Sequence, residues 1–131
     1  SGRPVSSISG GERQMVFIAR ALAQQAGLLL LDEPTAYLDI AHQVSIHGLL
    51  RQLNTESGLT VITVSHDLNL ASQYCSRLIL LSKGEIYVQG RPDAVITTGN
   101  IKDVYGCHPL VDRHPVTGTP RITLVPEDQI M

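Results

Sequence analysis

The chain has 131 residues and a formal net charge of −2, from 10 basic and 12 acidic side chains. Both signs are scattered along the chain, which argues against a protein that binds nucleic acid or an anionic membrane surface through a basic face. A chain of this length can bury a core but lies below the usual two-domain range, so we expect one domain or a large piece of one.

The apolar runs and the cysteines limit the class of protein further. No apolar run approaches the roughly 20 residues that a membrane-spanning helix needs, and the first residues do not have the pattern of a signal peptide. The two cysteines, Cys75 and Cys107, lack the C-x-x-C spacing of metal sites. We therefore expect a reduced, cytosolic protein, and any link to a membrane would have to run through partners.

The first predicted helix begins near Ser9. Ser9 and Glu12 have the spacing of a capping box, and apolar side chains follow at helical intervals at Met15, Ile18, Ala19 and Leu22. Gly10 and Gly11 would leave backbone N–H groups exposed at the positive end of the helix, which suits an anion such as phosphate. The local sequence alone favours ordinary capping over a phosphate site.

Four leucines, Leu28 to Leu31, then end abruptly in the carboxylates Asp32 and Glu33. This run fits a fully buried strand of a parallel sheet, although a buried helix gives the same pattern. At the carboxyl end of such a strand, where open α/β sheets bind ligands, the two carboxylates would point to opposite sides. Asp32 could then hold Mg²⁺ through water and Glu33 could activate a water, whereas a solvated acidic turn is the alternative.

A second amphipathic helix around Ile46 to Leu53 leads through Gly58 into a β-branched strand, Leu59 to Val64. A strand, helix and strand in this order predict a right-handed crossover and parallel pairing, which would bring His66 to the same sheet edge as Glu33. There His66 could donate to a phosphate. The alternative is a helix-start residue ahead of Asp67 as the cap.

The remaining elements are interpreted as a structural tail. Its last part, 109–126, contains several prolines and glycines, which are typical of turns. We expect a helix over 67–74, a hairpin of 77–81 and 85–89, helical stretches over 92–96 and 101–105, and a strand-like segment over 121–125. His42 and His47 are five residues apart, which is the wrong spacing for a shared metal on a helix, and His108 and His114 are read as exposed loop histidines.

Four segments of the chain, in sequence order, resemble the motifs of the ATP-binding-cassette (ABC) ATPase family. Ile8 to Glu12 resembles the signature loop, with Glu12 where glutamine is usual, and Leu28 to Glu33 resembles Walker B with its catalytic glutamate. Ala36 to Asp39 is similar to the D-loop, and His66 falls where the family has its switch histidine. Together with His66 to Ala71, the pattern looks most like the importers of ferric siderophores, haem and cobalamin.

The sequence has no Walker A motif, G-x-x-x-x-G-K-[ST]. This motif needs a lysine directly after a glycine, and neither of the two lysines, Lys83 and Lys102, follows a glycine. The resemblance therefore implies the carboxyl-terminal part of a P-loop NTPase domain, which is an α/β fold with a mostly parallel sheet flanked by helices. We expect an ATPase core portion over 1–90, with a small hairpin, and a helical and extended carboxyl-terminal extension over 91–131. These 131 residues alone are expected to be inactive.

The resemblance also implies the site of the intact subunit. Two copies would sandwich two ATP molecules with Mg²⁺ as cofactor, with Asp32, Glu33 and His66 serving one ATP. Ser9, Gly10 and Gly11 would serve the partner's ATP, with the Glu12 side chain in capping or ribose contacts. Asp39 would couple the two sites near the interface.

The implied function is ATP hydrolysis that energises import of an iron-siderophore, haem or cobalamin-type substrate. The partners would be a second ATPase subunit, membrane-spanning permease subunits and, indirectly, a substrate-binding protein, with the ATPase peripheral on the cytoplasmic face of the inner membrane. The alternatives are an ABC-type ATPase of DNA repair or chromosome organisation, which the missing heptads and basic stripe disfavour, and a non-enzymatic interaction module.

Overall fold

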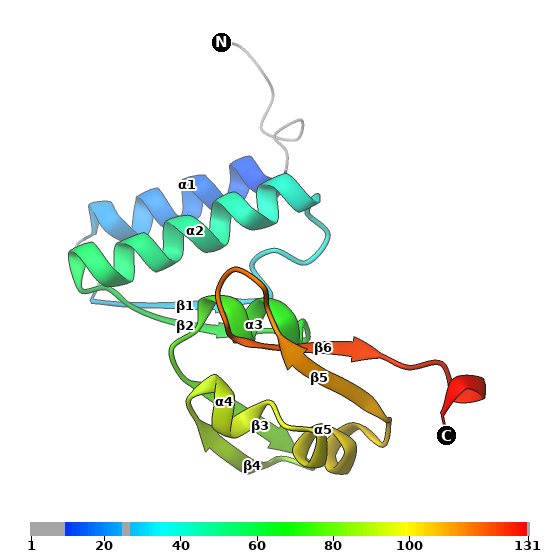
Figure 1. Ribbon diagram of the computed structural model, residues 1–131. Coiled ribbons are helices and arrows are strands. Elements are labelled where there is room, and N and C mark those ends of the chain that lie inside the picture. Colours follow the sequence, from blue (N-terminus) through cyan, green and yellow to red (C-terminus); the bar gives the residue numbers. More distant parts are fainter. Residues whose placement is uncertain (1–9, 25–26, 131) are drawn as a thin grey trace. The chain divides into compact units, whose positions relative to one another are not determined.

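The computed structural model describes residues 10–24 and 27–130, and the chain divides between His66 and Asp67 into two compact units (Figure 1). Ser9, the predicted cap of the first helix, lies outside the described residues. The predicted division at residue 90 rests on the family resemblance and stays a prediction. None of the helices in the described ranges combines the length and the hydropathy needed to span a bilayer.

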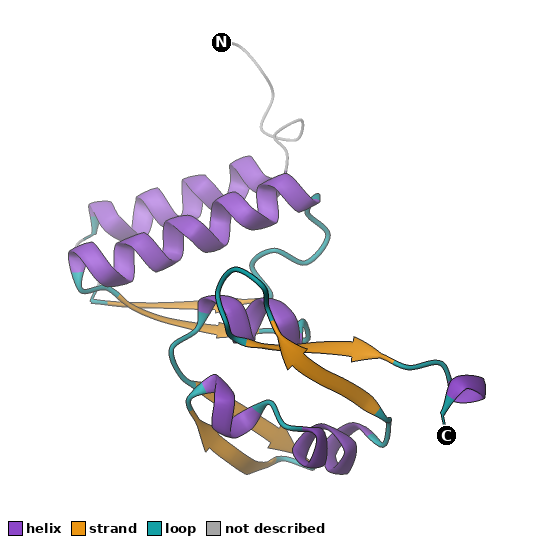
Figure 2. Ribbon diagram, in the orientation of Figure 1, coloured by secondary structure: helices purple, strands orange, loops and turns teal. Residues whose placement is uncertain are grey.

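The first unit consists of α1 (Gly10–Ala23), β1 (Leu28–Asp32), α2 (Ile40–Ser57) and β2 (Thr60–Val64). β1 and β2 pair in parallel, from Leu28 opposite Thr60 to Asp32 opposite Val64. The strand interpretation of the leucine run is therefore confirmed, as is the parallel crossover through α2 (Figure 2).

The core of the first unit lies between the two helices and one face of the strand pair. Ile18 of α1 and Ile46 and Leu50 of α2 are buried in one cluster with Leu29, Leu31 and Leu59. α1 and α2 lie side by side over this face (Figure 1).

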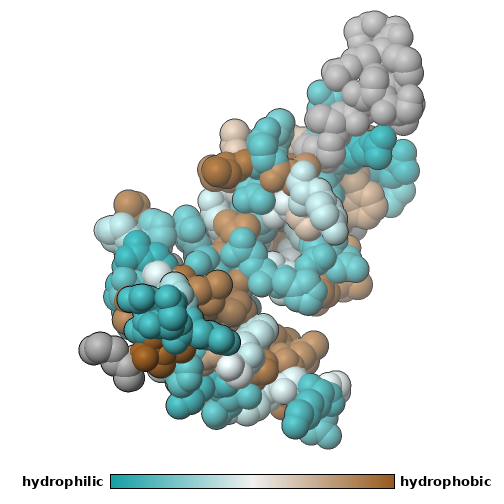
Figure 3. Space-filling view, turned by 90° about the vertical axis from the view of Figure 1, so that its right-hand side faces the viewer, coloured by the Kyte–Doolittle hydropathy of each residue, from teal (hydrophilic) through white to brown (hydrophobic). Residues whose placement is uncertain are grey.

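The opposite face of the pair corrects one expectation. Burial on both faces was predicted for β1, but Leu28 and Leu30 are 55% and 64% exposed, and Ile62 and Val64 of β2 are 49% and 52% exposed. The reason is that, among the described residues of the first unit, both helices pack on the other face and no element covers this side. Figure 3 shows brown apolar atoms reaching the surface between teal polar ones.

The second unit is built from short helices and two antiparallel hairpins, so parallel pairing among the described residues is confined to the first unit. Its elements are α3 (Leu68–Tyr74), β3 (Leu78–Ser82), β4 (Glu85–Gly90), α4 (Pro92–Val95), α5 (Thr98–Tyr105), β5 (Pro109–Arg113), β6 (Pro120–Leu124) and a 3-10 turn at Glu127–Gln129. β3 and β4 are joined through Lys83 and Gly84, whose positive φ values of 52° and 76° suit a two-residue hairpin turn.

The helices of this unit pack on the hairpins around a second core. The buried side chains are Leu78, Leu80, Val95, Ile96, Ile101 and Ile122. The predicted helices and the first hairpin are confirmed within a few residues. β5 was missed, since its segment begins with a proline and reads as part of a loop, yet it pairs with β6 along its length.

Two polar side chains of α3 bind the backbone of β6. Asn69 Nδ2 donates to the Ile122 carbonyl at 3.0 Å, and the Ile122 N–H donates back to Asn69 Oδ1 at 2.7 Å. The Ser72 hydroxyl donates to the Pro120 carbonyl at 2.6 Å, and Ser72 is only 1% exposed. These bonds tie α3 to a strand almost fifty residues later in the chain.

We expect Ser72→Ala to loosen β6, because the variant leaves a buried carbonyl without this donor. The local opening free energy of the β6 amides, measured by hydrogen exchange, should fall by about 1–3 kcal/mol. Ser45→Ala, at an exposed position of α2, is the matched control and should change these amides by no more than about 0.5 kcal/mol. Unchanged β6 exchange in Ser72→Ala would contradict this assignment.

Candidate catalytic site at the ends of β1 and β2

Glu33 directly follows β1 and continues its pairing with β2. The Glu33 N–H donates to the Val64 carbonyl at 2.7 Å, so the residue is held at the end of the strand pair. Its φ of 45° is left-handed, which is unusual for a residue other than glycine, and such backbone persists where the surrounding structure holds it. The Glu33 side chain is 34% exposed, so its carboxylate can meet both protein and solvent.

His66 reaches this carboxylate from the end of β2. His66 Nε2 lies 3.4 Å from Glu33 Oε1, and the His66 side chain is 87% exposed. The crossover through α2 therefore brings the two residues together at one sheet edge, as the sequence predicted. Their roles in catalysis remain proposals.

Asp32 is the last residue of β1, opposite Val64, and is exposed. Among the described residues, no three His, Cys, Asp or Glu side chains gather into a metal cluster. A single exposed carboxylate is nevertheless the kind of oxygen ligand that Mg²⁺ uses when water and substrate phosphates supply the rest. The donor chemistry at this edge thus fits Mg²⁺.

Asp39 ends the loop after Glu33 and caps α2. Its Oδ1 accepts from the His42 N–H at 2.8 Å and lies 2.8 Å from His42 Nδ1. The hydrogen bond from the His42 backbone is the main cause that lowers the pKa of Asp39, and the His42 side chain adds to it. Asp39 therefore has a visible role as a helix cap, and its predicted role in coupling two sites stays a prediction.

The predicted signature loop is described only from Gly10 onward. Gly10 and Gly11 form the start of α1, and Glu12 is an exposed acidic residue in its first turn. A helix N-terminus favours a negative charge there, in line with the capping role assigned to Glu12. Ser9 lies outside the described residues, so the phosphate site of this loop stays a prediction.

Sequence reasoning missed three residues beside the carboxylates. Thr35 is only 5% exposed, and its hydroxyl lies 2.8 Å from His47 Nε2. Gln43 Nε2 donates to the carbonyl oxygens of Thr35, at 3.4 Å, and of Leu38, at 3.2 Å. The available signal was the spacing of Gln43 and His47, which places two polar side chains one helical turn apart beside the buried Ile46.

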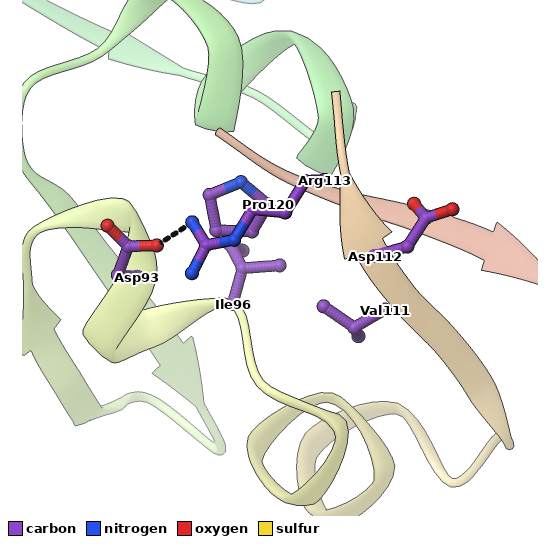
Figure 4. Close-up of a pocket in the computed structure, with 6 residues that line it drawn as sticks. All are labelled: Asp93, Ile96, Val111, Asp112, Arg113 and Pro120. Atoms are coloured by element: carbon purple, nitrogen blue, oxygen red, sulfur yellow. Dashed lines mark hydrogen bonds and ion pairs between the residues drawn. The ribbon is translucent and has the colours of Figure 1, made fainter. Parts of the chain in front are cut away.

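The second unit has a separate hollow of about 190 Å³, lined by Asp93, Ile96, Val111, Asp112, Arg113 and Pro120 (Figure 4). Its charged side chains bind one another or nearby backbone. Arg113 pairs with Asp93 and donates to the Gly118 carbonyl at 3.0 Å. Two hydrogen bonds from Arg121, at 2.9 and 2.7 Å, lower the pKa of Asp112. The hollow therefore reads as structural.

Known proteins match both the sequence and the fold. The family model described as "ABC transporter" matches residues 1–36. The chain is 46% identical over 118 residues to the ferric enterobactin transport ATP-binding protein FepC of Escherichia coli, covering 90% of this chain and 44% of that protein. It is 41% identical over 127 residues to the cobalamin import ATP-binding protein BtuD of Halobacterium salinarum, covering 97% and 32% respectively.

The same likeness holds in three dimensions. A structure described as an inward-facing ABC transporter of the metal-chelate type superposes with a TM-score of 0.85 at 28% identity, covering 98% of this chain and 51% of that chain. The chain spans less than half the length of the curated relatives named here. In both sequence and fold the chain is therefore similar to ABC transporter ATP-binding proteins.

Proposed function

We propose that these residues are part of an ATP-hydrolysing subunit, and that the full-length protein energises import of an iron-siderophore, haem or cobalamin-type substrate. The observation that carries the proposal is the approach of Glu33 and His66, 3.4 Å apart at the carboxyl ends of β1 and β2. This is the edge at which open α/β sheets bind ligands. The names of the relatives support the substrate class.

In this proposal Glu33 orients and deprotonates the water that attacks the γ-phosphate, which is the task of a positioned carboxylate. His66 donates an N–H to the same phosphate, and its high exposure leaves room for a nucleotide to approach. The His66 imidazole lies beside Glu33 and follows β2. Loss of the γ-phosphate would remove a hydrogen-bond acceptor from His66 and so change the contacts at the end of this strand. The residues thus link hydrolysis to the strand that follows α2.

Asp32 would hold Mg²⁺, most simply through a water molecule. When bound, the ion neutralises charge on the phosphate oxygens during transfer. Asp32 ends β1 and Glu33 follows it, and in this proposal the first carboxylate serves the metal and the second serves the water.

The partners follow from the family. We propose that two copies of the full-length subunit sandwich ATP, with Ser9, Gly10, Gly11 and Glu12 of one copy facing the nucleotide of the other. Closure of this dimer on ATP and its reopening after hydrolysis would drive permease subunits at the cytoplasmic face of the inner membrane. A substrate-binding protein would deliver the cargo to them.

The test is uptake by the parent organism with and without the gene. Deletion should abolish ATP-dependent uptake of one of three labelled cargoes, a ferric siderophore, haem or cobalamin, and a plasmid copy should restore it. The purified full-length protein should release phosphate from ATP in the presence of Mg²⁺ and lose this activity in EDTA. Normal uptake of all three cargoes after deletion would contradict the importer proposal, whereas absent phosphate release would contradict the ATPase proposal.

A further inference from the structure

We propose that Gln43 and His47 of α2 latch the loop that carries Glu33 by binding Thr35, and so position the catalytic carboxylate without touching the substrate. This α2 latch consists of Thr35, Gln43 and His47. It rests on the proposed ATPase function and adds to it a set of positioning residues that the motifs do not contain.

The latch binds Thr35 through both its side chain and its backbone. The hydroxyl lies 2.8 Å from His47 Nε2, and the carbonyl accepts from Gln43 Nε2 at 3.4 Å. Gln43 also donates to the Leu38 carbonyl at 3.2 Å, so a single amide binds the loop at two points. Gln43 and His47 lie one turn apart on α2, whose Ile46 and Leu50 are buried in the core. The loop is thereby attached to a rigid element.

The loop needs such an attachment because its backbone is unusual. Glu33 and Tyr37 have positive φ values of 45° and 70°, and neither is glycine. Tyr37 is fully exposed, with a relative exposure of 103%, so its side chain does not hold the loop. Thr35, which lies between these two residues, is 5% exposed and is the point at which the loop is held from inside.

A short path of hydrogen bonds connects the latch to the carboxylate. The Ala36 N–H donates to the Glu33 carbonyl and the Leu38 N–H donates to the Thr35 carbonyl, both at 3.2 Å, so 33–38 forms two consecutive tight turns. A shift of Thr35 would move Glu33 through the first of these turns. The separation of 3.4 Å between Glu33 and His66 would then change, and misplacement of about 1 Å can lower a rate by about 10²-fold.

The test uses steady-state kinetics of the full-length protein with variants of nearly unchanged shape. Thr35→Val and Gln43→Ala should each lower kcat about 10- to 100-fold while the KM for ATP stays within about twofold, since neither residue contacts the nucleotide. Thr35→Ser keeps the hydroxyl and should retain near-normal kcat. This rescue separates the latch from a role in mere packing.

Matched controls come from the same helix. Gln52 donates to Glu56, and the Thr55 hydroxyl donates to the carbonyls of Arg51 and Gln52, all on the exposed side of α2. Gln52→Ala and Thr55→Val should leave kcat near normal. If Thr35→Val and Gln43→Ala also leave kcat within about twofold, the latch proposal is wrong.

A second readout does not depend on activity. Hydrogen exchange of the Ala36 and Leu38 amides in the full-length protein should accelerate at least about tenfold in Gln43→Ala and stay unchanged in Gln52→Ala. Thr35 is buried and its valine variant can fail to fold, so Gln43→Ala then decides the question. If the wild-type protein hydrolyses no ATP, the ATPase proposal fails, and these two amides still test the latch: unchanged exchange in Gln43→Ala would overturn it.

Discussion

Replacing Glu33 with glutamine in the full-length protein should lower ATP hydrolysis by about 10²-fold or more while ATP binding persists. Glutamine keeps the shape of the side chain but cannot accept a proton, so the variant removes the proposed base and little else. The Glu33 N–H would still donate to Val64, because that bond belongs to the backbone. Phosphate release at saturating ATP measures the loss, and equilibrium binding of radiolabelled ATP measures what is retained.

The control for this substitution is Glu56→Gln on α2. Glu56 is exposed, accepts a hydrogen bond from the Gln52 side chain and lies in the last turn of α2, whereas the carboxylate loop precedes the first turn of that helix. It should hydrolyse ATP at the wild-type rate. Near-normal turnover in Glu33→Gln would show that the base lies elsewhere, and loss of ATP binding would show that Glu33 is needed for the nucleotide rather than for the water.

Much of the site follows from sequence patterns that act over short distances. Four leucines before Asp32 could not be distinguished from a buried helix by periodicity, but flanking Gly27 and Pro34 and the next β-branched run, Leu59 to Val64, favoured strands. Once both segments are strands joined by one helix, handedness and parallel pairing follow, and Glu33 and His66 must end at the same edge. The meeting of these two side chains was therefore predictable from order alone.

The latch was not predictable in the same way. Gln43 and His47 stand where an amphipathic pattern expects apolar side chains, and their purpose depends on a loop whose path requires positive φ at Glu33 and Tyr37. Sequence spacing identified His47 only as the wrong distance from His42 for a metal. A polar residue on the buried side of a helix is best understood through its partner, and Thr35 can be recognised as that partner only in three dimensions.

The strand β5 was not predicted, for a different reason. Its segment begins with Pro109 and is followed by His114, Pro115 and Gly118, which are signals of turns. A proline at the first position of a strand is tolerated, and the hairpin to β6 supplies the pairing that local propensity does not. Pairing across the hairpin thus outweighed the local turn signals.

The second large effect concerns the 131 residues expressed alone, which we expect to self-associate. The outer face of the β1–β2 pair exposes four apolar side chains, at Leu28, Leu30, Ile62 and Val64, each about half exposed or more. Among the described residues each strand of the pair has a single partner, so both outer edges carry unpaired backbone groups. An apolar face bounded by open edges favours pairing with a second copy.

The exposed face itself gives the decisive variant. Leu30 lies opposite Ile62 in the parallel register, and both are exposed on the outer face, so Leu30→Lys with Ile62→Lys places two positive charges side by side at its centre. The charges should repel a second copy and leave the helix-covered face, with Leu29 and Leu31, unchanged. Val116→Lys changes a loop position of the other unit that is 87% exposed, so it adds charge outside the strand pair and is the control.

Sedimentation velocity across a dilution series measures the outcome. The wild-type residues and the Val116→Lys control should show a mass that rises with concentration, while the double lysine variant should remain a monomer over the same range. Association through this face needs no ATP, which separates it from the proposed ATP-dependent dimer of the full-length subunit. A monodisperse wild-type monomer at tens of micromolar would show that the outer face of β1 and β2 does not drive self-association. Equal association of the double variant would show that the contact lies elsewhere.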